Sequence, residues 1–391
     1  MVSAIHRALR AALPTACAIL LAACAGAGAP AAQPAAPAPA QPGGAAAPTA
    51  SSAALPAAAA PTAASAAAPA AAQPAPLAPP VTVRIGVLPN ISDSGTYIAL
   101  ERGYFQEEGI NLELVPFDSA GPQVAPLGAG QLDVGGGSTS AGLYNAIARD
   151  VPLKVVADRG SMPPGASWIG LVVRQDLVGE IRDYADLRGR RIAINQFATT
   201  NDIAIEAALK RGGLTMQDAD IQQIPYSDMN AALANRSIDV AQHNEPFKAI
   251  AIEQGLGTFF HGVDEYYPNM QFSVVLFGPQ FVKNKPEAAR RWMVGFLRGV
   301  RDYNDALRKG IRKDETIQLI MKHVPLRDAG LFDKMGFTAL NPDGKLNVEG
   351  VRNDLQWFVD HGMTQQAPDL SQVIDTSFAE YAVQRLGPYA Q

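Results

Sequence analysis

Short apolar runs alternate with amphipathic segments along the chain from residue 81 onward. Residues 81–88 are rich in Val and Ile and predict a strand, which Pro89 and Asn90 end. Ser92 then offers an N-cap for a helix that Gly103 ends. Further strands are predicted at 111–116, 132–134, 154–157, 191–194, 221–224 and from 240, with helices between them. This rhythm predicts an α/β fold with mostly parallel sheets, covered by helices on both faces.

Two strand-like segments, at residues 168–174 and 271–277, interrupt that rhythm and bracket a self-contained run of strands and helices. We therefore predict two lobes joined by a two-strand hinge, with crossings near Ile169 and Val274. The predicted boundaries are 81–170 and 275–391 for lobe 1, and 171–274 for the inserted lobe 2.

The N-terminal region predicts export and a lipid anchor. Residues 1–23 combine basic residues with a short apolar run, which is typical of a signal peptide. The small residues directly before Cys24 resemble a bacterial lipobox, so Cys24 is the expected lipidation site. Residues 24–80 are almost only small residues, Pro and Gln, and we expect them to form a disordered Ala/Pro tether.

Composition excludes several classes of site in the predicted lobes. The two cysteines are Cys17 and Cys24, so the region after the tether has no thiol for a disulfide, a metal or a nucleophile. The histidines lack metal-ligand spacing, and no catalytic triad or HExxH pattern is present. The net charge of −5 argues against a nucleic-acid partner. We expect no metal, no cofactor and no enzymatic activity.

A series of motifs follows in fixed order along the chain. The segments are ERGYFQEEGINLEL at 101–114, LGAGQLDVG at 127–135, DLRGRRIAI at 186–194, LANRSIDV at 233–240, Glu245-Pro246, Phe281-Val282 and Pro286-Glu287. This series resembles the ABC transporter substrate-binding proteins that handle sulfonates, nitrate and thiamine pyrimidine precursors. The segment at 233–240 departs from the family's pattern, with Arg236 or Ser237 where glycine is usual.

The resemblance implies a type II periplasmic binding protein with two Rossmann-like lobes around a cleft. It implies a monomer that captures a small nutrient outside the cytoplasm and delivers it to ABC permease transmembrane subunits with a cytoplasmic ATPase. Two alternatives stay open: a sensory lipoprotein, and an enzyme on the same fold. Related enzymes use cysteine chemistry that the predicted lobes lack.

Ligands of open α/β sheets bind beyond the carboxyl ends of the strands, and this rule selects the candidate site residues. These are Asn90, Asp93, Ser94, Tyr97, Ser138, Thr139, Arg159, Trp168, Thr199, Thr200, Tyr226, His243, Asn244 and Glu245. The loop at 195–201, Tyr266 and Tyr267 are further candidates.

The predicted rim holds three acidic residues, Asp93, Asp228 and Glu245, and one clear cation, Arg159. Acidic and amide acceptors beside Trp168 and Tyr226 favour a planar ligand with N–H donors, such as a thiamine pyrimidine precursor or a riboflavin-like vitamin. The alternative ligand is a sulfonate, taurine or nitrate, which would prefer cations and N–H groups.

Overall fold

Two five-stranded mixed sheets organise the chain, and each corresponds to one predicted lobe. The computed structural model describes residues 74–364 and 366–390. The strands are β1 (Val81–Val87), β2 (Ile110–Pro116), β3 (Val134–Gly137), β4 (Lys154–Gly160), β5 (Ile169–Arg174), β6 (Arg191–Ile194), β7 (Asp220–Gln223), β8 (Val240–Asn244), β9 (Gly257–Gly262) and β10 (Ser273–Phe277).

Both sheets follow one plan. Their strand orders are β2-β1-β3-β10-β4 and β7-β6-β8-β5-β9. In the first sheet β10 runs antiparallel to β3 and β4, and in the second β5 runs antiparallel to β8 and β9. The two strands that follow the crossings, β5 and β10, therefore occupy equivalent places in the two sheets.

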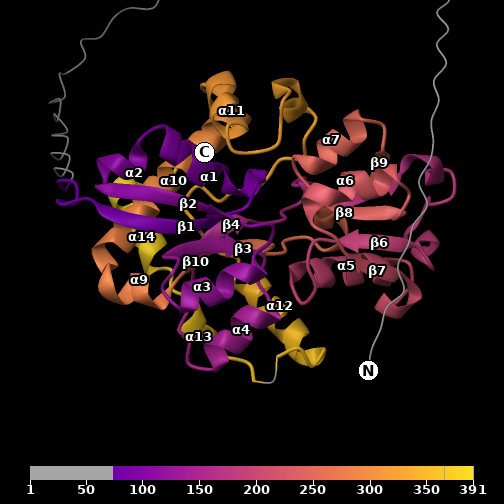
Figure 1. The fold of residues 1–391 in the computed structure, drawn as a ribbon, viewed down its shortest axis with the longest axis horizontal. Helices are drawn as coiled ribbons and strands as arrows, with labels where there is room; N and C mark the ends of the chain where they lie inside the picture. The colour runs from indigo at the N-terminus through magenta and orange to yellow at the C-terminus, as the bar shows by residue number, and fades with distance from the viewer. Residues whose placement is uncertain (1–73, 365, 391) are drawn as a thin grey trace, which may run out of the picture. The chain divides into compact units, whose positions relative to one another are not determined.

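Helices cover both faces of each sheet (Figure 1). In Figure 1, α1 and α10 lie on one face of the first sheet and α3 and α4 on the other, while α5 lies opposite α6 and α7 on the second. The helices are α1 (Ser94–Glu101), α2 (Tyr104–Glu107), α3 (Val124–Gly128), α4 (Ala141–Ala148), α5 (Thr200–Arg211), α6 (Tyr226–Ala234), α7 (Phe247–Glu253), α8 (Val263–Tyr266), α9 (Pro279–Asn284), α10 (Pro286–Lys309), α11 (Lys313–Met321), α12 (Val348–Asp360), α13 (Leu370–Val373) and α14 (Ser377–Leu386). The architecture is that of a type II periplasmic binding protein, as predicted.

The two crossings pair with each other just outside the sheets. The N–H of Met162 donates to the carbonyl of Met270 at 3.0 Å, and the N–H of Asn269 donates to the carbonyl of Met162 at 2.6 Å. The prediction placed this pairing at Ile169 and Val274. Those residues lie inside different sheets, where neighbouring strands already pair with them, so the connectors before them pair instead.

Three consecutive glycines belong to strand β3. Gly135–Gly137 complete β3, and their lack of side chains leaves room for two neighbours. A Cβ on Gly135 would lie 2.6 Å from Oε1 of Gln123, and a Cβ on Gly136 would lie 2.9 Å from Cδ of Arg159. The sequence analysis missed β9, which contains the polar residues Thr258 and His261.

The last residues of the predicted tether pack on lobe 1. The N–H of Leu77 donates to the carbonyl of Glu108 at 3.2 Å, and Nη1 of Arg291 donates to the carbonyl of Ala75 at 2.6 Å. The single large apolar side chain near the end of the tether, Leu77, is half-buried there. The predicted signal peptide, Cys24 and the tether up to residue 73 lie outside the described residues. No helix in residues 74–364 or 366–390 combines the length and apolar character needed to span a membrane.

Candidate ligand-binding cleft

A small cavity of about 20 Å³ lies where the carboxyl ends of parallel strands from both lobes meet. Asn90 and Ser138 follow β1 and β3 of lobe 1, while Asn195 follows β6 and Asn244 ends β8 of lobe 2. A volume of this size holds about one water molecule. A larger ligand can therefore enter only if the lobes separate.

The cavity is lined by a subset of the predicted site residues together with some that the sequence did not indicate. Lining residues from the prediction are Asn90, Ser138, Trp168, Tyr226 and Asn244, with Asn195 and Gln196 from the predicted loop. Phe272 and Ser273 also line it. Both were hidden in the sequence because the segment 271–277 reads as a continuous buried strand. Contact of these residues with a ligand stays a prediction.

The lining is polar without being charged. Its polar side chains are amides and hydroxyls, and none of the residues that line the cavity is acidic or basic. The three acidic residues expected at the rim are elsewhere: Asp93 and Glu245 are buried behind the cavity, and Asp228 is exposed on α6. The acidic rim that favoured a planar ligand with N–H donors is therefore absent from this cavity.

Asp93 and Arg159 form a buried ion pair behind the cavity wall. Nε of Arg159 donates to Oδ1 of Asp93 at 2.8 Å, and a second contact joins Nη2 to Oδ2. Asp93 also accepts the N–H of Leu88 at 2.6 Å, which fixes the turn after β1. Both ions are buried, with exposed fractions of 0% for Asp93 and 3% for Arg159. Both residues were predicted to line the binding site, but neither lines the cavity, because their charged groups face each other.

Lobe 2 contributes a network of neutral side chains. Oδ1 of Asn195 accepts the N–H of Tyr226 at 3.1 Å, and the Tyr226 hydroxyl donates to Oδ1 of Asn201 at 2.8 Å. Nε2 of Gln242 donates to the carbonyl of Asn201 at 3.1 Å. These bonds fix Asn195 and Tyr226 at the cavity wall before any ligand arrives.

His243 and Glu245 serve the framework instead of lining the cavity. His243 is fully buried between the rings of Tyr226 and Phe247, and burial lowers its pKa to about 3, so the ring is neutral. Glu245 accepts the N–H of Ala249 at 3.1 Å and the N–H of Gly336 at 2.9 Å, and pairs with Lys248 at 3.1 Å. Glu245 thus ties lobe 2 to the C-terminal segment.

Helices α4 and α5 cap each other across the lobes. The N–H of Ala141 donates to the carbonyl of Ala198 at 3.0 Å, and the N–H of Thr200 donates to the carbonyl of Thr139 at 3.2 Å. Thr199 caps α5 through its hydroxyl, which accepts the N–H of Asn201 at 3.2 Å. These N–H groups at the starts of α4 and α5 therefore bond to protein carbonyls in this closed arrangement.

Ser94 and Tyr97 lie in α1, away from the cavity. The Tyr97 hydroxyl donates to the carbonyl of Leu88 at 2.7 Å, and its ring stacks on His323 with centroids 4.5 Å apart. Ser94 is fully buried. The helical spacing that placed both residues near the strand end also turned them toward the core of lobe 1.

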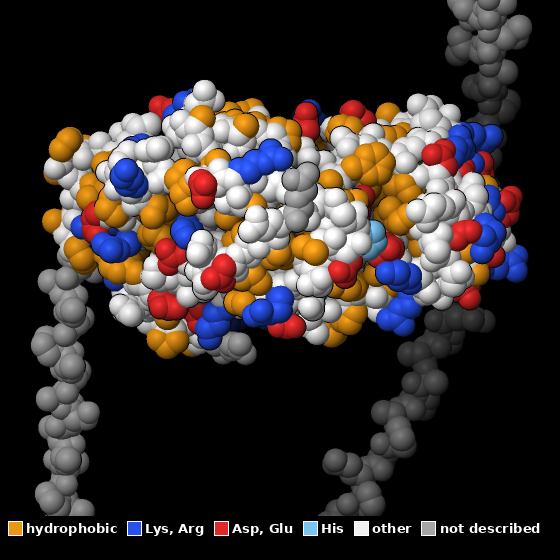
Figure 2. Space-filling view, turned by 90° about the horizontal axis from the view of Figure 1, so that it is seen from below, with side chains coloured by type: hydrophobic (Ala, Val, Ile, Leu, Met, Phe, Trp, Pro, Cys, Tyr) orange, Lys and Arg blue, Asp and Glu red, His pale blue; other side chains and the backbone are white. Residues whose placement is uncertain are grey.

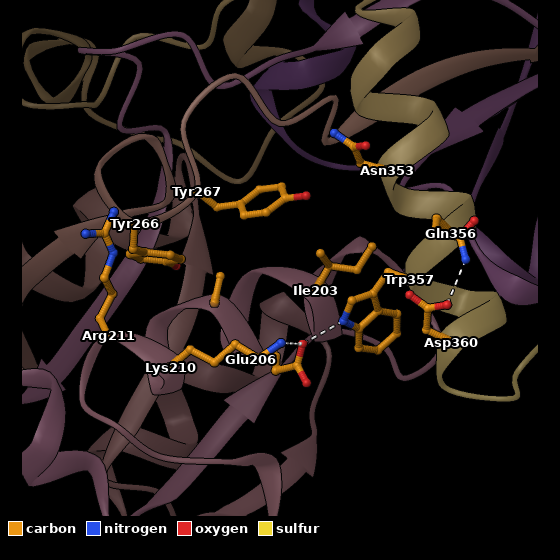
Figure 3. A pocket seen from close by; sticks show the side chains of 11 residues that line it. Ile203, Glu206, Lys210, Arg211, Tyr266, Tyr267, Asn353, Gln356, Trp357 and Asp360 are labelled. Atoms are coloured by element: carbon orange, nitrogen blue, oxygen red, sulfur yellow. Dashed lines mark hydrogen bonds and ion pairs between the residues drawn. The ribbon is translucent and has the colours of Figure 1, made fainter.

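A second, open crevice of about 470 Å³ lies between α5 and α12 (Figure 3). It holds Tyr266 and Tyr267, which were candidates for the interlobe cleft. Nε1 of Trp357 on α12 donates to Oε2 of Glu206 on α5 at 2.7 Å. Residues after 275, predicted to belong to lobe 1, therefore contact lobe 2 as well.

Charged side chains of both signs are intermixed on the face seen in Figure 2, without a large area of one sign. In the part of the chain that the structure describes, no group of three or more His, Cys, Asp or Glu side chains is placed to hold a metal ion.

Curated relatives include proteins named as binding proteins. A Brucella abortus protein named as a binding protein is 24% identical over 258 residues, which cover 65% of this chain and 75% of that relative. A Bacillus subtilis protein named as an aliphatic sulfonates-binding protein is 28% identical over 228 residues, which cover 56% of this chain and 64% of that relative.

Solved structures share the fold at low sequence identity. The nitrate-binding protein NrtA from Synechocystis PCC 6803 gives a TM-score of 0.65 at 16% identity, covering 80% of this chain and 90% of that chain. The aliphatic sulphonate binding protein SsuA from Escherichia coli gives 0.60 at 20% identity, covering 77% and 99%. A desulfurization enzyme, DSZB, also shares the fold, with a TM-score of 0.55 at 16% identity and coverage of 78% and 99%. The neighbours are mostly binding proteins, and at these identities they establish the fold alone.

A family model places the chain more specifically than the structural neighbours do. The model described as NMT1/THI5 like matches residues 90–305, which include strands β2 to β10 and all but one of the residues that line the cavity. The match extends over more than half of the chain, and the chain therefore belongs to the NMT1/THI5-like family.

Proposed function

We propose that this chain is the substrate-binding component of an ABC importer, and that its cleft captures a small oxyanion of the sulfonate or nitrate type. The observation that carries the proposal is the uncharged, donor-bearing lining shared by the two lobes. Amide and hydroxyl groups can donate hydrogen bonds to oxyanion oxygens, and no carboxylate lines the cavity to repel them. Relatives named for sulfonate and nitrate binding support the same ligand class.

A planar heteroaromatic, such as a thiamine pyrimidine precursor or a riboflavin-like vitamin, is the second candidate ligand. It is favoured by the three aromatic side chains that line the cavity, Trp168, Tyr226 and Phe272. All three rings already have aromatic partners. Trp168 meets Phe272 edge to face at 5.6 Å, and Tyr226 stacks on His243 at 6.0 Å. A stacked ligand would have to replace or extend these contacts, so we rank this candidate below the oxyanion.

The chain would act outside the cytoplasm, anchored to the membrane through a lipid on Cys24, and would deliver its ligand as a monomer to the permease. The support is the lipobox-like sequence before Cys24. Mass spectrometry of the membrane-extracted protein tests this: a diacylglyceryl adduct on Cys24 is expected, and an unmodified Cys24 thiol would contradict it.

Isothermal titration of unfolded and refolded protein, which carries no ligand from its host, tests the ligand class. The panel is methanesulfonate, ethanesulfonate, nitrate, riboflavin and an aminopyrimidine. We expect saturable binding of a sulfonate or nitrate. Saturable binding of the aromatic compounds alone would replace the first ligand class with the second.

Two variants that each replace one asparagine by aspartate, and so add the same charge at different places, sharpen this test. Asn195→Asp adds a carboxylate to the cleft while leaving an oxygen to accept the N–H of Tyr226. Like charges in close contact cost several kcal/mol, so oxyanion affinity should fall on the order of a hundredfold. Asn235→Asp is the matched control, because Asn235 is exposed outside the cleft and its Oδ1 likewise accepts a backbone N–H, that of Ser237. Equal affinities for the two variants would contradict an anionic ligand.

A further inference from the structure

Two buried polar side chains that line the cavity have an atom without a hydrogen-bond partner among the described residues. These atoms are the hydroxyl of Ser273 and Oδ1 of Asn244, on residues with exposed fractions of 3% and 1%. A buried polar group without a partner costs about 1–3 kcal/mol, so such groups in a native cleft call for a ligand partner. Ser273 belongs to lobe 1 and Asn244 to lobe 2.

Ser273 lies beside a shift in the register between β10 and β4, and the same shift positions Arg159. In the β10–β4 pair, Ser273 aligns with Gly160 and Val274 aligns with Asp158, so Arg159 is the extra residue on its strand. Extra residues of this kind re-aim side chains and are frequent beside functional sites. Here the Arg159 side chain passes over Gly136, where a Cβ would come within 2.9 Å of it.

Arg159 retains hydrogen-bonding capacity after it has paired with Asp93. Nε and Nη2 contact the carboxylate, while Nη1 is buried and has no hydrogen-bond partner in residues 74–364 or 366–390. The guanidinium cannot lose its proton, so this N–H group needs an acceptor. Among the described residues, lobe 1 therefore holds buried donors without hydrogen-bond partners on either side of one strand irregularity, including Nη1 of Arg159 on β4 and the Ser273 hydroxyl on β10.

We propose that lobe 1 recognises the charged end of the ligand. The Ser273 hydroxyl donates to an oxyanion oxygen directly, and the Arg159 guanidinium, held in place by Asp93, supplies the positive charge behind it. This inference rests on the proposed function. It adds which half of the cleft holds the oxyanion and which residues determine specificity. Lobe 2 then closes over the remainder of the ligand with Asn244 and Tyr226.

Titration of the refolded full chain with methanesulfonate and with its uncharged counterpart dimethyl sulfone tests the inference. Ser273→Ala should lower methanesulfonate affinity about tenfold or more, as expected for the loss of a hydrogen bond to a charged group. Ser94→Ala is the matched control, because the Ser94 hydroxyl is equally buried and unpartnered but does not line the cavity. It should bind as the wild type does.

The charge is tested with the paired variant Arg159→Gln/Asp93→Asn, which removes both ions and leaves neither unpaired. We expect it to lose about tenfold or more in methanesulfonate affinity relative to the wild type while dimethyl sulfone binding changes little. One outcome is that the wild type binds methanesulfonate with the same affinity as both Ser273→Ala and the paired variant. That result overturns the inference while the proposed function stands. If the wild type binds no oxyanion of the panel, the proposed function fails first. Should the paired variant fail to fold, Ser273→Ala against Ser94→Ala decides alone.

Discussion

The two lobes share one strand order and differ in what their buried ions contact. In lobe 1, Asp93 follows β1 and pairs with Arg159 of β4, whose Nη1 has no hydrogen-bond partner among the described residues. In lobe 2, the buried ions Glu245 and Lys248 pair with each other and bond to the backbone, while the neutral side chains of Asn195 and Tyr226 line the cavity. Under the proposed function, this difference divides ligand selection unequally, with electrostatic recognition in lobe 1 and neutral hydrogen bonding in lobe 2.

The lobes also share a turn at the opposite end of their sheets. In lobe 1, Asp133 exchanges two hydrogen bonds with the backbone of Arg84, at 2.9 and 3.0 Å. In lobe 2, Asp239 exchanges the equivalent bonds with the backbone of Arg191, at 2.9 and 3.0 Å. Each aspartate therefore joins the start of its own strand to the neighbouring parallel strand.

The largest expected effect concerns pH, because lobe 1 buries a carboxyl group beside the hinge. Burial raises the pKa of Asp158 to about 6, although it accepts hydrogen bonds from Asn341, Gln271 and Gly160. The folded protein keeps this proton while the unfolded chain loses it near pH 4. The stabilisation is therefore present below pH 4 and is lost as pH rises through 6, by up to about 3 kcal/mol.

Denaturant unfolding of Asp158→Asn between pH 4 and 7 checks this expectation. The variant should show a shallower decline than the wild type. A residual slope should persist, because burial also raises the pKa of Asp202 in lobe 2 to about 6 and that of Asp354 well above its usual value. Identical profiles for variant and wild type would show that Asp158 does not titrate in this range.

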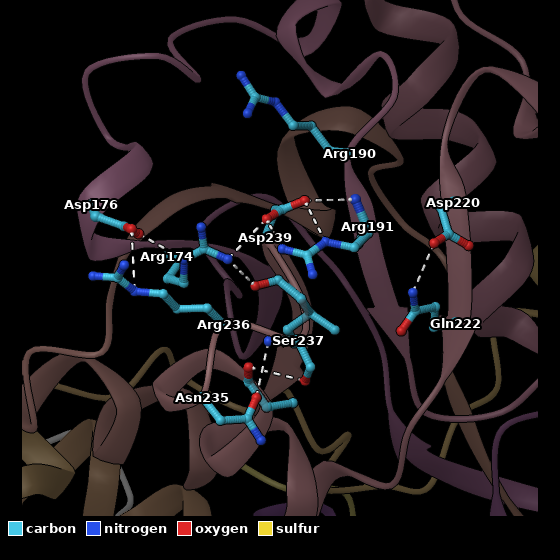
Figure 4. A network of polar contacts seen from close by, with 12 residues as sticks. Arg174, Asp176, Arg190, Arg191, Asp220, Gln222, Asn235, Arg236, Ser237 and Asp239 are labelled. Atoms are coloured by element: carbon cyan, nitrogen blue, oxygen red, sulfur yellow. Dashed lines mark hydrogen bonds and ion pairs between the residues drawn. The ribbon is translucent and has the colours of Figure 1, made fainter.

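The next effect compares the two aspartates of the shared turn. Asp239 pairs with Arg174 at 2.8 Å and with Arg191 at 2.6 Å (Figure 4), and these cations lower its pKa to about 2 against the opposing effect of burial. Asp133 has one cation, Lys285 at 3.0 Å. We expect Asp239→Ala to cost about 2–3 kcal/mol in unfolding free energy, because the buried Arg174 loses one of its two carboxylate partners and keeps Asp176 alone, at 2.6 Å. Asp133→Ala should cost less, and the reverse order would contradict the comparison.

A smaller effect should appear at the residue that precedes each aspartate by three positions. Lobe 1 has Gly130 there with a φ of 71°, and lobe 2 has Arg236 with a φ of 63°, which is the left-handed region that favours glycine. Arg236→Gly should raise the unfolding free energy by about 0.5–1 kcal/mol. Among the described residues, Arg236 loses one ion pair, with Asp176 at 3.6 Å, which is exposed and contributes little. Gly130→Ala should lower the unfolding free energy. A lower unfolding free energy for Arg236→Gly would contradict backbone strain at this position.

Much of this organisation was predictable because parallel sheets give clear sequence signals. Buried strands rich in Val and Ile, and the two strand-like segments at 168–174 and 271–277, indicated both lobes and the strand ends that meet at the cleft. The rule that ligands lie beyond carboxyl ends selected Asn90, Asn195 and Asn244, which line the cavity.

The errors at the predicted rim share one cause, which is that a residue's position along the chain does not fix the direction of its side chain. Asp93 and Glu245 stand at strand ends, yet their carboxylates turn toward Arg159 and Lys248 instead of the cavity. Ser273 was overlooked because the strand irregularity that aims Arg159 exists only once β10 and β4 have paired. The pairing of Met162 with Met270 depends likewise on both lobes being in place.

Closure of the two lobes around a small oxyanion can be measured directly by electron–electron double resonance. The native cysteines are Cys17 and Cys24, so spin labels on Asp118→Cys and Ser227→Cys, one exposed site in each lobe, report a single distance once both native cysteines are replaced by serine. We predict a broad distance distribution without ligand and a shift to one shorter, narrower distance at saturating methanesulfonate. An unchanged distribution at a concentration that saturates binding would contradict capture by closure.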